Sequence, residues 1–132
     1  MSEKKVNIHI VESDKLFMKV LLRTIGDIET DHDIRIHSHK DGFEFMEDAR
    51  PSPGRTIYII NDVLPKKNGI ELAKHIRTYD RTGVIYFMTR ANTEADMIYA
   101  VNAGVDNYFT KPFNLALFQA LIRRRIIRGD LA

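Results

Sequence analysis

Four apolar segments of the sequence end in side chains that could do chemistry together. The polar residues directly after them are Glu12, Ser13 and Asp14, then Asn61 and Asp62, then Thr89 and Arg90, and finally Thr110 and Lys111. Carboxylates supply the oxygen ligands that Mg²⁺ prefers, and hydroxyl and ammonium groups can neutralise the charge of a phosphoryl group. Each residue alone is explained equally well as a solvated loop residue. As a set, they predict a site that handles phosphoryl groups.

The apolar segments alternate with segments of helical spacing, and this alternation would bring the polar residues together. The predicted strands cover 6–11, 34–38, 57–60, 84–88 and 105–109, and the predicted helices cover about 16–25, 43–46, 70–76, 95–103 and a last segment that starts at Asn114 as its N-cap. Strict alternation of this kind predicts an α/β domain with a doubly wound parallel sheet. The functional crevice of such a sheet lies outside the carboxyl ends of its strands.

The length and composition narrow the class of protein. A chain of 132 residues predicts one domain, which we assign to 1–128, with 129–132 as a tail or the start of a linker. Twenty Lys and Arg against eighteen Asp and Glu are too even a balance to predict direct contact with nucleic acid. The absence of cysteine excludes disulfides and Cys-ligated metals. No apolar run approaches the roughly 20 residues of a membrane span, so we expect a soluble, cytoplasmic protein.

From Val6 to about Arg128 the chain resembles the receiver domain of bacterial response regulators. The residues that carry the resemblance are Ile10-Val11-Glu12-Ser13-Asp14, Asn61 four residues before Pro65, Asn68-Gly69, Thr89, Ala103-Gly104-Val105-Asp106, Tyr108 and Lys111-Pro112-Phe113. The resemblance implies a flavodoxin-like (βα)5 fold with strand order 2-1-3-4-5. It also implies a domain of two-component signal transduction, part of a phosphorelay, rather than an enzyme.

In this family an aspartate after the third strand accepts a phosphoryl group from a phosphohistidine, with Mg²⁺ held by two acids after the first strand. A sensor histidine kinase is therefore an implied partner. In this chain the acceptor position is Asn61, and a neutral amide cannot form the acyl phosphate. Ser13 replaces the second acid, which leaves Glu12 as the metal ligand and predicts a weak or absent Mg²⁺ site. Arg90 stands where the family has a small residue, and it could pair with Glu12.

These departures predict an atypical receiver, or pseudo-receiver, that works without aspartyl phosphorylation. Thr89, Tyr108 and Lys111, which the resemblance makes the switch residues, are kept. We expect Lys111 to pair with Glu12 or to donate to the Asn61 oxygen, and Thr89 to hydrogen-bond the Asn61 amide, which would fix one state of the domain.

The resemblance also implies an interaction surface. It is formed by the fourth helix, fifth strand and fifth helix, with Ile98, Tyr99, Tyr108 and Phe118. This face would meet a protein partner, the chain's own output domain or a second copy in a homodimer.

Other interpretations stay open at this point. Asn61 could be an engineered Asp-to-Asn change in an ordinary Mg²⁺-dependent receiver, although a designer would have no motive to alter Ser13. Asp62 could be the acceptor in a shifted register, but side chains alternate along a strand, so Asp62 should lean away from a pocket that Asn61 faces. Asp14 could serve as a substitute ligand or as a first-turn helix acid.

The sequence disfavours both an enzyme that binds a cofactor and a metal site at the histidines. A cofactor-binding flavodoxin-like enzyme needs a phosphate-binding loop after the first strand, and an acidic Glu12-Ser13-Asp14 would repel phosphate. His37 and His39 share a strand face, but no further metal ligand can be predicted nearby, so both are expected at the surface.

Overall fold

The alternation of apolar and amphipathic segments builds five strands and five helices in the part of the chain that the structure, a computed structural model, describes: residues 5–48, 54–90 and 93–128. The elements are β1 (Lys5–Val11), α1 (Lys15–Gly26), β2 (Asp33–His39), α2 (Gly42–Asp48), β3 (Arg55–Asn61), α3 (Gly69–Arg77), β4 (Val84–Thr89), α4 (Glu94–Asn102), β5 (Asn107–Thr110) and α5 (Leu115–Arg128). All neighbouring strands are parallel, in the order β2-β1-β3-β4-β5. The predicted fold class is confirmed. The predicted tail 129–132 lies outside the described residues.

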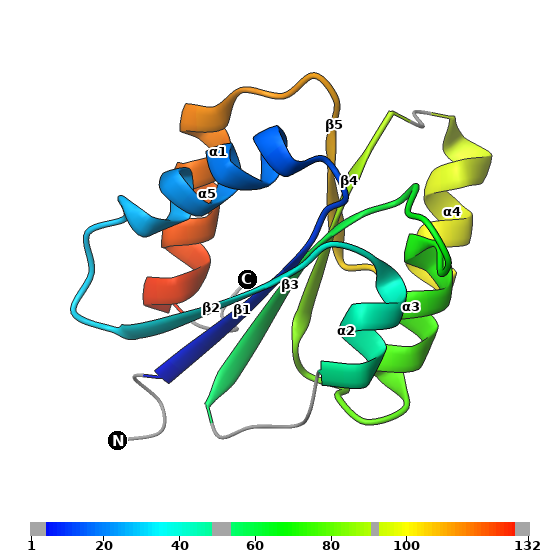
Figure 1. The fold of residues 1–132 in the computed structure, drawn as a ribbon, viewed down its shortest axis with the longest axis horizontal. Coiled ribbons are helices and arrows are strands. Elements are labelled where there is room, and N and C mark those ends of the chain that lie inside the picture. The colour runs from blue at the N-terminus through cyan, green and yellow to red at the C-terminus, as the bar shows by residue number, and fades with distance from the viewer. Residues whose placement is uncertain (1–4, 49–53, 91–92, 129–132) are drawn as a thin grey trace.

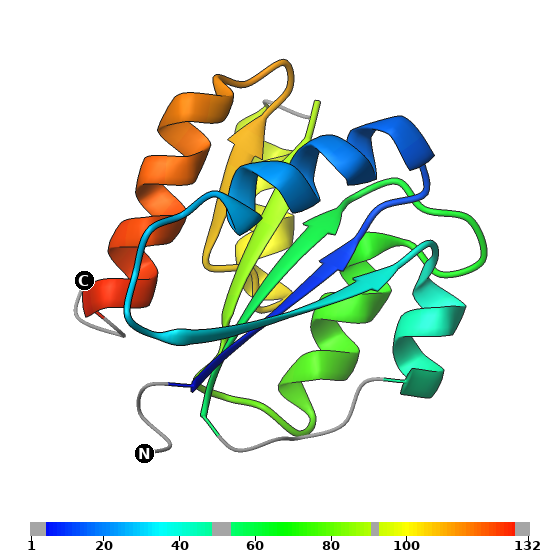
Figure 2. The same ribbon diagram turned by 60° about the vertical axis from the view of Figure 1, so that its left-hand side comes forward.

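Helices cover both faces of the sheet, which is why the central strands are apolar on both sides. Helices α1 and α5 lie on one face, and α2, α3 and α4 lie on the other (Figures 1 and 2). Side chains of β3 alternate between the two cores: Ile57 and Ile59 pack toward α1 and α5, while Tyr58 and Ile60 pack toward α3 and α4. Each fully buried side chain of this size contributes about 1.5–3 kcal/mol to stability.

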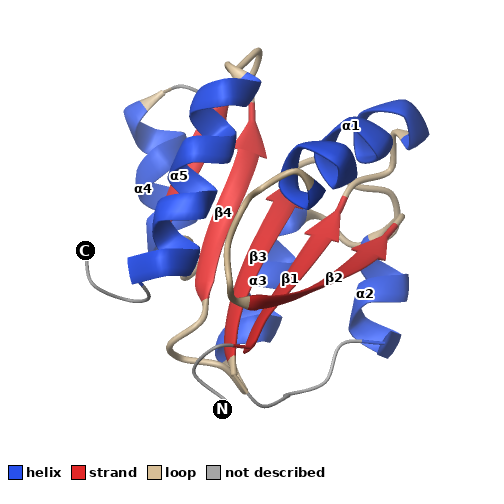
Figure 3. Cartoon of the chain, turned by 90° about the vertical axis from the view of Figure 1, so that its left-hand side faces the viewer, coloured by secondary structure: helices blue, strands red, loops and turns tan. Residues whose placement is uncertain are grey.

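The register of the strands gathers their carboxyl ends at one edge of the sheet. Val11 pairs with Ile60, Asn61 with Met88, and Thr89 with Thr110. Figure 3 shows the arrowheads of β1, β2, β3 and β4 at this edge. The polar residues that follow the strands are therefore neighbours in space.

Short side chains cap the helices that begin at this edge. Asp14 caps α1, Asn68 forms a capping box with Glu71 at the start of α3, and Thr93 caps α4. Asn114 accepts the backbone N–H of Leu117 at 3.0 Å, which confirms the predicted start of α5.

The start of β5 and the burial of one residue differ from the predictions. β5 begins at Asn107 rather than Val105, because the Val105 N–H bonds to the Ala100 carbonyl and Val105 closes the turn after α4. Phe118, expected on the interaction surface, is fully buried against Phe109, since α5 turns this side chain toward the sheet. Ile98 and Tyr99 are exposed, as expected.

Three histidines stack on one face of the neighbouring strands β1 and β2. His9 stacks on His37 and His39, with ring centroids 4.6 and 5.3 Å apart. The prediction that His39 lies at the surface is wrong: it is 4% exposed, because α2 packs Phe45 against its ring. Burial lowers the pKa of His9 to about 3, and the imidazoles of His37 and His39 add to the effect. Burial also lowers the pKa of His39.

Candidate functional site

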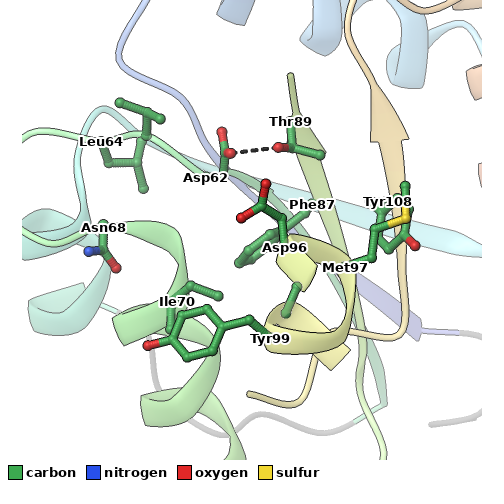
Figure 4. A pocket seen from close by; sticks show the side chains of 12 residues that line it. Asp62, Leu64, Asn68, Ile70, Phe87, Thr89, Asp96, Met97, Tyr99 and Tyr108 are labelled. Atoms are coloured by element: carbon green, nitrogen blue, oxygen red, sulfur yellow. Dashed lines mark hydrogen bonds between the residues drawn. The ribbon is translucent and has the colours of Figure 1, made fainter. Parts of the chain in front are cut away.

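The polar strand ends line two adjoining hollows at the carboxyl edge of the sheet. The first hollow is lined by the predicted site residues Glu12, Ser13, Asp14, Asn61, Asp62, Arg90 and Lys111. The second, of about 380 Å³, lies between β4, β5 and α4 and is lined by Asp62, Thr89 and Tyr108 (Figure 4). Asp62 borders both hollows.

A buried hydrogen bond joins the ends of β1 and β3. The Asn61 Nδ2 donates to Glu12 Oε1 at 2.9 Å, and both side chains are buried. Glu12 Oε2 accepts the Asp14 N–H at 3.0 Å, and Asn61 Oδ1 accepts the Val63 N–H at 3.2 Å. An aspartate at position 61 would instead face Glu12 with a second negative charge. The amide therefore suits this position without a cation between the two side chains.

A second hydrogen bond joins the ends of β3 and β4. The Thr89 hydroxyl donates to Asp62 Oδ2 at 2.6 Å, as the dashed line in Figure 4 shows. We expected Thr89 to hydrogen-bond the Asn61 amide. Its hydroxyl has one proton to donate, and this proton goes to Asp62, while the Asn61 side chain bonds to Glu12 and to the Val63 N–H. Asp62 and Asn61 turn in different directions from adjacent positions, one toward Thr89 and the other toward Glu12.

The start of α3 packs against the end of β3, at the residues Asn61 and Asp62. The Gly69 N–H donates to the Asp62 carbonyl at 2.9 Å. A Cβ on Gly69 would lie 2.8 Å from the Asp62 Cα and 3.1 Å from the Asn61 carbonyl oxygen. Only glycine allows this close approach without displacing the backbone that carries both side chains.

The two cations of the site do not pair with Glu12. Between the described residues there is no ion pair from Lys111 or Arg90 to Glu12, so both expected pairings are wrong. Lys111 Nζ lies over the Phe17 ring, 6.0 Å from its centroid, and its backbone N–H donates to the Thr89 carbonyl. Arg90 is exposed at the rim. The two oxygens of Glu12 instead accept hydrogen bonds from the Asp14 N–H and the Asn61 amide.

The acidic residues after β1 already accept hydrogen bonds from the chain. Ser13 is exposed, and Asp14 uses Oδ1 to accept the N–H groups of Leu16 and Phe17 at 2.9 and 3.0 Å. Glu12 is the one buried carboxylate among the described residues that line this hollow, and its Oε1 accepts the Asn61 amide. A tight Mg²⁺ site in a protein uses several carboxylate or carbonyl oxygens.

Tyr108 stands half-buried on β5 and lines the second hollow with Thr89, Phe87 and Met97. Met97 and Asp96 of α4 were not identified from the sequence, although helical spacing from the Thr93 cap would have placed them on this side of α4. The hollow therefore connects the hydroxyl of Thr89 to the face formed by α4 and β5.

A parallel sheet of order 2-1-3-4-5 with polar side chains gathered at its carboxyl edge defines a flavodoxin-like α/β domain. The family model described as "Response regulator receiver domain" matches residues 8–123. The chain therefore belongs to the response regulator receiver family, whose members are signalling modules of two-component systems.

Named relatives agree with this assignment. The chain is 29% identical over 108 residues to the transcriptional regulatory protein CpxR of Escherichia coli strain K12, covering 79% of this chain and 44% of CpxR. It is 30% identical over 104 residues to the chemotaxis protein CheY of Halobacterium salinarum, covering 79% of this chain and 83% of CheY. The chain thus spans less than half the length of CpxR.

Solved structures share the fold. The response regulator DrrB of Thermotoga maritima matches with a TM-score of 0.79 at 22% identity, over 94% of this chain and 54% of DrrB. A two-component response regulator from Clostridium difficile matches with a TM-score of 0.77 at 24% identity, over 96% of this chain and 99% of that structure. No helix among the described residues is long and apolar enough to cross a membrane.

Proposed function

We propose that this chain is an atypical receiver, a cytoplasmic protein-interaction module that works without aspartyl phosphorylation. The observation that carries the proposal is the hydrogen bond from Asn61 to Glu12 at the acceptor position. An amide nitrogen that donates to a buried carboxylate has no anionic oxygen with which to attack phosphorus. The same hydrogen bond engages the Glu12 carboxylate, which would otherwise bind Mg²⁺.

Asp62 supplies a fixed negative charge where phosphorylation would create one. In a phosphorylated receiver, the phosphoryl group draws in the threonine hydroxyl and the switch aromatic moves into the vacated space. Here the Asp62 carboxylate already accepts the Thr89 hydroxyl at 2.6 Å. We infer that this bond fixes the switch in one state, with Tyr108 held at the edge of the hollow. Phosphorylation normally biases a two-state equilibrium, and this chain would not use it.

The interaction surface in this proposal is the face formed by α4, β5 and α5. Ile98, Tyr99 and Val101 of α4 are 52%, 58% and 54% exposed, and Leu117 and Leu121 of α5 are 58% and 38% exposed. Exposed apolar side chains of this size on adjoining elements mark interaction sites on soluble domains. The partner would be another protein, such as a sensor histidine kinase, an output domain of the same protein or a second copy of this domain.

The proposal is tested by NMR of the wild-type chain, labelled with ¹⁵N and ¹³C, in the presence of acetyl phosphate and Mg²⁺. We expect no shift of the Thr89 or Tyr108 amides and one set of Tyr108 side-chain resonances. The matched control is the double variant Ser13→Asp/Asn61→Asp, which restores both lost acids and should show shifts at these amides. Shifts of the wild-type chain equal to those of the control would overturn the proposal.

A further inference from the structure

The carboxyl end of β2 places one imidazole beside two carboxylates of α2. A ring nitrogen of His39 and one carboxylate oxygen each of Glu44 and Asp48 lie within 4.8 Å of one another. His39 is the last residue of β2, and Glu44 and Asp48 are one turn apart on α2. The three side chains adjoin the Asn61 pocket without taking part in its hydrogen bonds. The Glu12 N–H donates to the His39 carbonyl at 3.0 Å, whereas the Asn61 side chain bonds to Glu12 and Val63.

The imidazole of His39 has one nitrogen bound and the other free. Nε2 lies 3.1 Å from His9 Nδ1, whereas Nδ1 is buried and has no hydrogen-bond partner. A buried polar atom without a partner is unusual and calls for an explanation. If the ring proton sits on Nε2 and is donated to His9, Nδ1 carries a free lone pair. Metal-binding histidines are held in this way, with the second nitrogen donating to a neighbour that fixes the ring.

The two carboxylates also lack a counter-charge. Among the described residues, neither Glu44 nor Asp48 forms an ion pair with a lysine or arginine side chain. Glu44 Oε1 accepts only the Lys40 N–H, at 3.2 Å. Two like charges four residues apart on a helix repel each other. A cation between them would remove that repulsion and occupy the lone pair of His39.

We propose that His39, Glu44 and Asp48 form a binding site for a divalent ion of the zinc class. One imidazole nitrogen and two carboxylate oxygens are a donor set that Zn²⁺ accepts, with water in the fourth position. The exposed side chain of Asp48 is free to close the site. A hollow of about 280 Å³ opens beside His39 and Glu44 and gives the ion access to the ring. Its lining also includes Glu12 and Ser13 and the lysines Lys15, Lys19 and Lys40.

Isothermal titration of the whole chain with Zn²⁺ tests the site. We expect one ion per chain with a dissociation constant in the micromolar range or below. Glu44→Gln and Asp48→Asn should each weaken binding about tenfold or more, and His39→Gln should abolish it. Glu47→Gln is the matched control, because Glu47 lies on the same helix, is exposed and loses the same charge. No binding, or equal loss in Glu47→Gln and Asp48→Asn, would overturn the inference.

A second measurement is independent of the stability of the variants. Zn²⁺ bound at this site must shift the ¹⁵N resonance of His39 Nδ1 in the wild-type chain, whereas Mg²⁺ at the same concentration must not. Glu12→Gln separates this site from the pocket beside it. Zn²⁺ affinity that is lost in Glu12→Gln but kept in Asp48→Asn would place the ion in the acidic pocket and contradict the proposal. Neither result depends on whether the domain can be phosphorylated.

Discussion

The hydroxyl of Thr89 donates to the carboxylate of Asp62 across 2.6 Å, and this bond ties the end of β4 to the turn after β3. The neighbouring residue, Asn61, turns to Glu12 instead. Two adjacent residues thus make different contacts. The neutral amide of Asn61 binds Glu12 at the end of β1, and the negatively charged Asp62 binds Thr89 at the end of β4. The proposed function rests on these two hydrogen bonds.

The Asp62–Thr89 bond should appear as a coupling free energy. In a double-mutant cycle of Asp62→Asn and Thr89→Val, we expect about 1–2 kcal/mol of coupling by urea denaturation, because a hydrogen bond to a charged acceptor is lost. Thr110→Val is the control partner, since Thr110 also ends a strand but is exposed. Equal coupling of Asp62 to both threonines would mean that the bond is not formed in solution.

Glu12 and Lys111 should differ sharply in their contribution to stability. Glu12→Ala removes the acceptor of the Asn61 amide and the Asp14 N–H, so we expect a loss of about 1–3 kcal/mol. Lys111→Ala removes a cation that lies over the Phe17 ring, and about 0.5 kcal/mol is expected. Thermal or urea denaturation of both variants measures the difference. A cost for Lys111→Ala equal to that of Glu12→Ala would show that an ion pair between them forms in solution.

Mg²⁺ should bind weakly, with a dissociation constant in the millimolar range or above, because one buried carboxylate is left in the hollow and its oxygens already accept hydrogen bonds. NMR titration of the Glu12 and Asn61 amides provides the measurement. Ser13→Asp/Asn61→Asp should tighten binding by about tenfold or more. Micromolar affinity of the wild-type chain would mean that Asp14 or Asp62 completes a metal site.

Acid should destabilise the fold through His9. Its pKa is about 3 in the folded chain and 6.5 in the unfolded chain, so the unfolded state takes up the proton first. The contribution of neutral His9 to the free energy of unfolding is complete above pH 6.5. It is lost as the pH falls toward 3, by up to about 1.4 kcal/mol per pH unit. His9→Gln should show a shallower loss between pH 6.5 and 4.5 than the wild type, whereas His75→Gln should match the wild type. Parallel curves for all three chains would contradict the burial of a neutral His9.

Sequence patterns were sufficient for the fold because each strand has its own apolar run and its own following helix. The same patterns indicated which residues gather at the edge of the sheet, since parallel strands share that edge. They did not indicate the bonds between those residues. Thr89 and Asn61 both lie at strand ends, but which acceptor the hydroxyl reaches depends on the turn that Gly69 allows, and this is a property of packing.

Burial was the other property that local patterns missed. His39 lies on an edge strand with exposed neighbours, and it is covered by the His9 ring and by Phe45 of α2. The spacing of Glu44 and Asp48 after His39 was visible in the sequence, but without the burial of the ring it carried no sign of a metal site.

The intact mass of the wild-type chain after incubation with acetyl phosphate and Mg²⁺ tests the central claim most directly. The variant Ser13→Asp/Asn61→Asp serves as the positive control for the phosphodonor. We predict that the wild-type mass stays unchanged while the control gains one phosphoryl group. A phosphoryl adduct on the wild-type chain, mapped to Asp62 by peptide sequencing, would contradict the account.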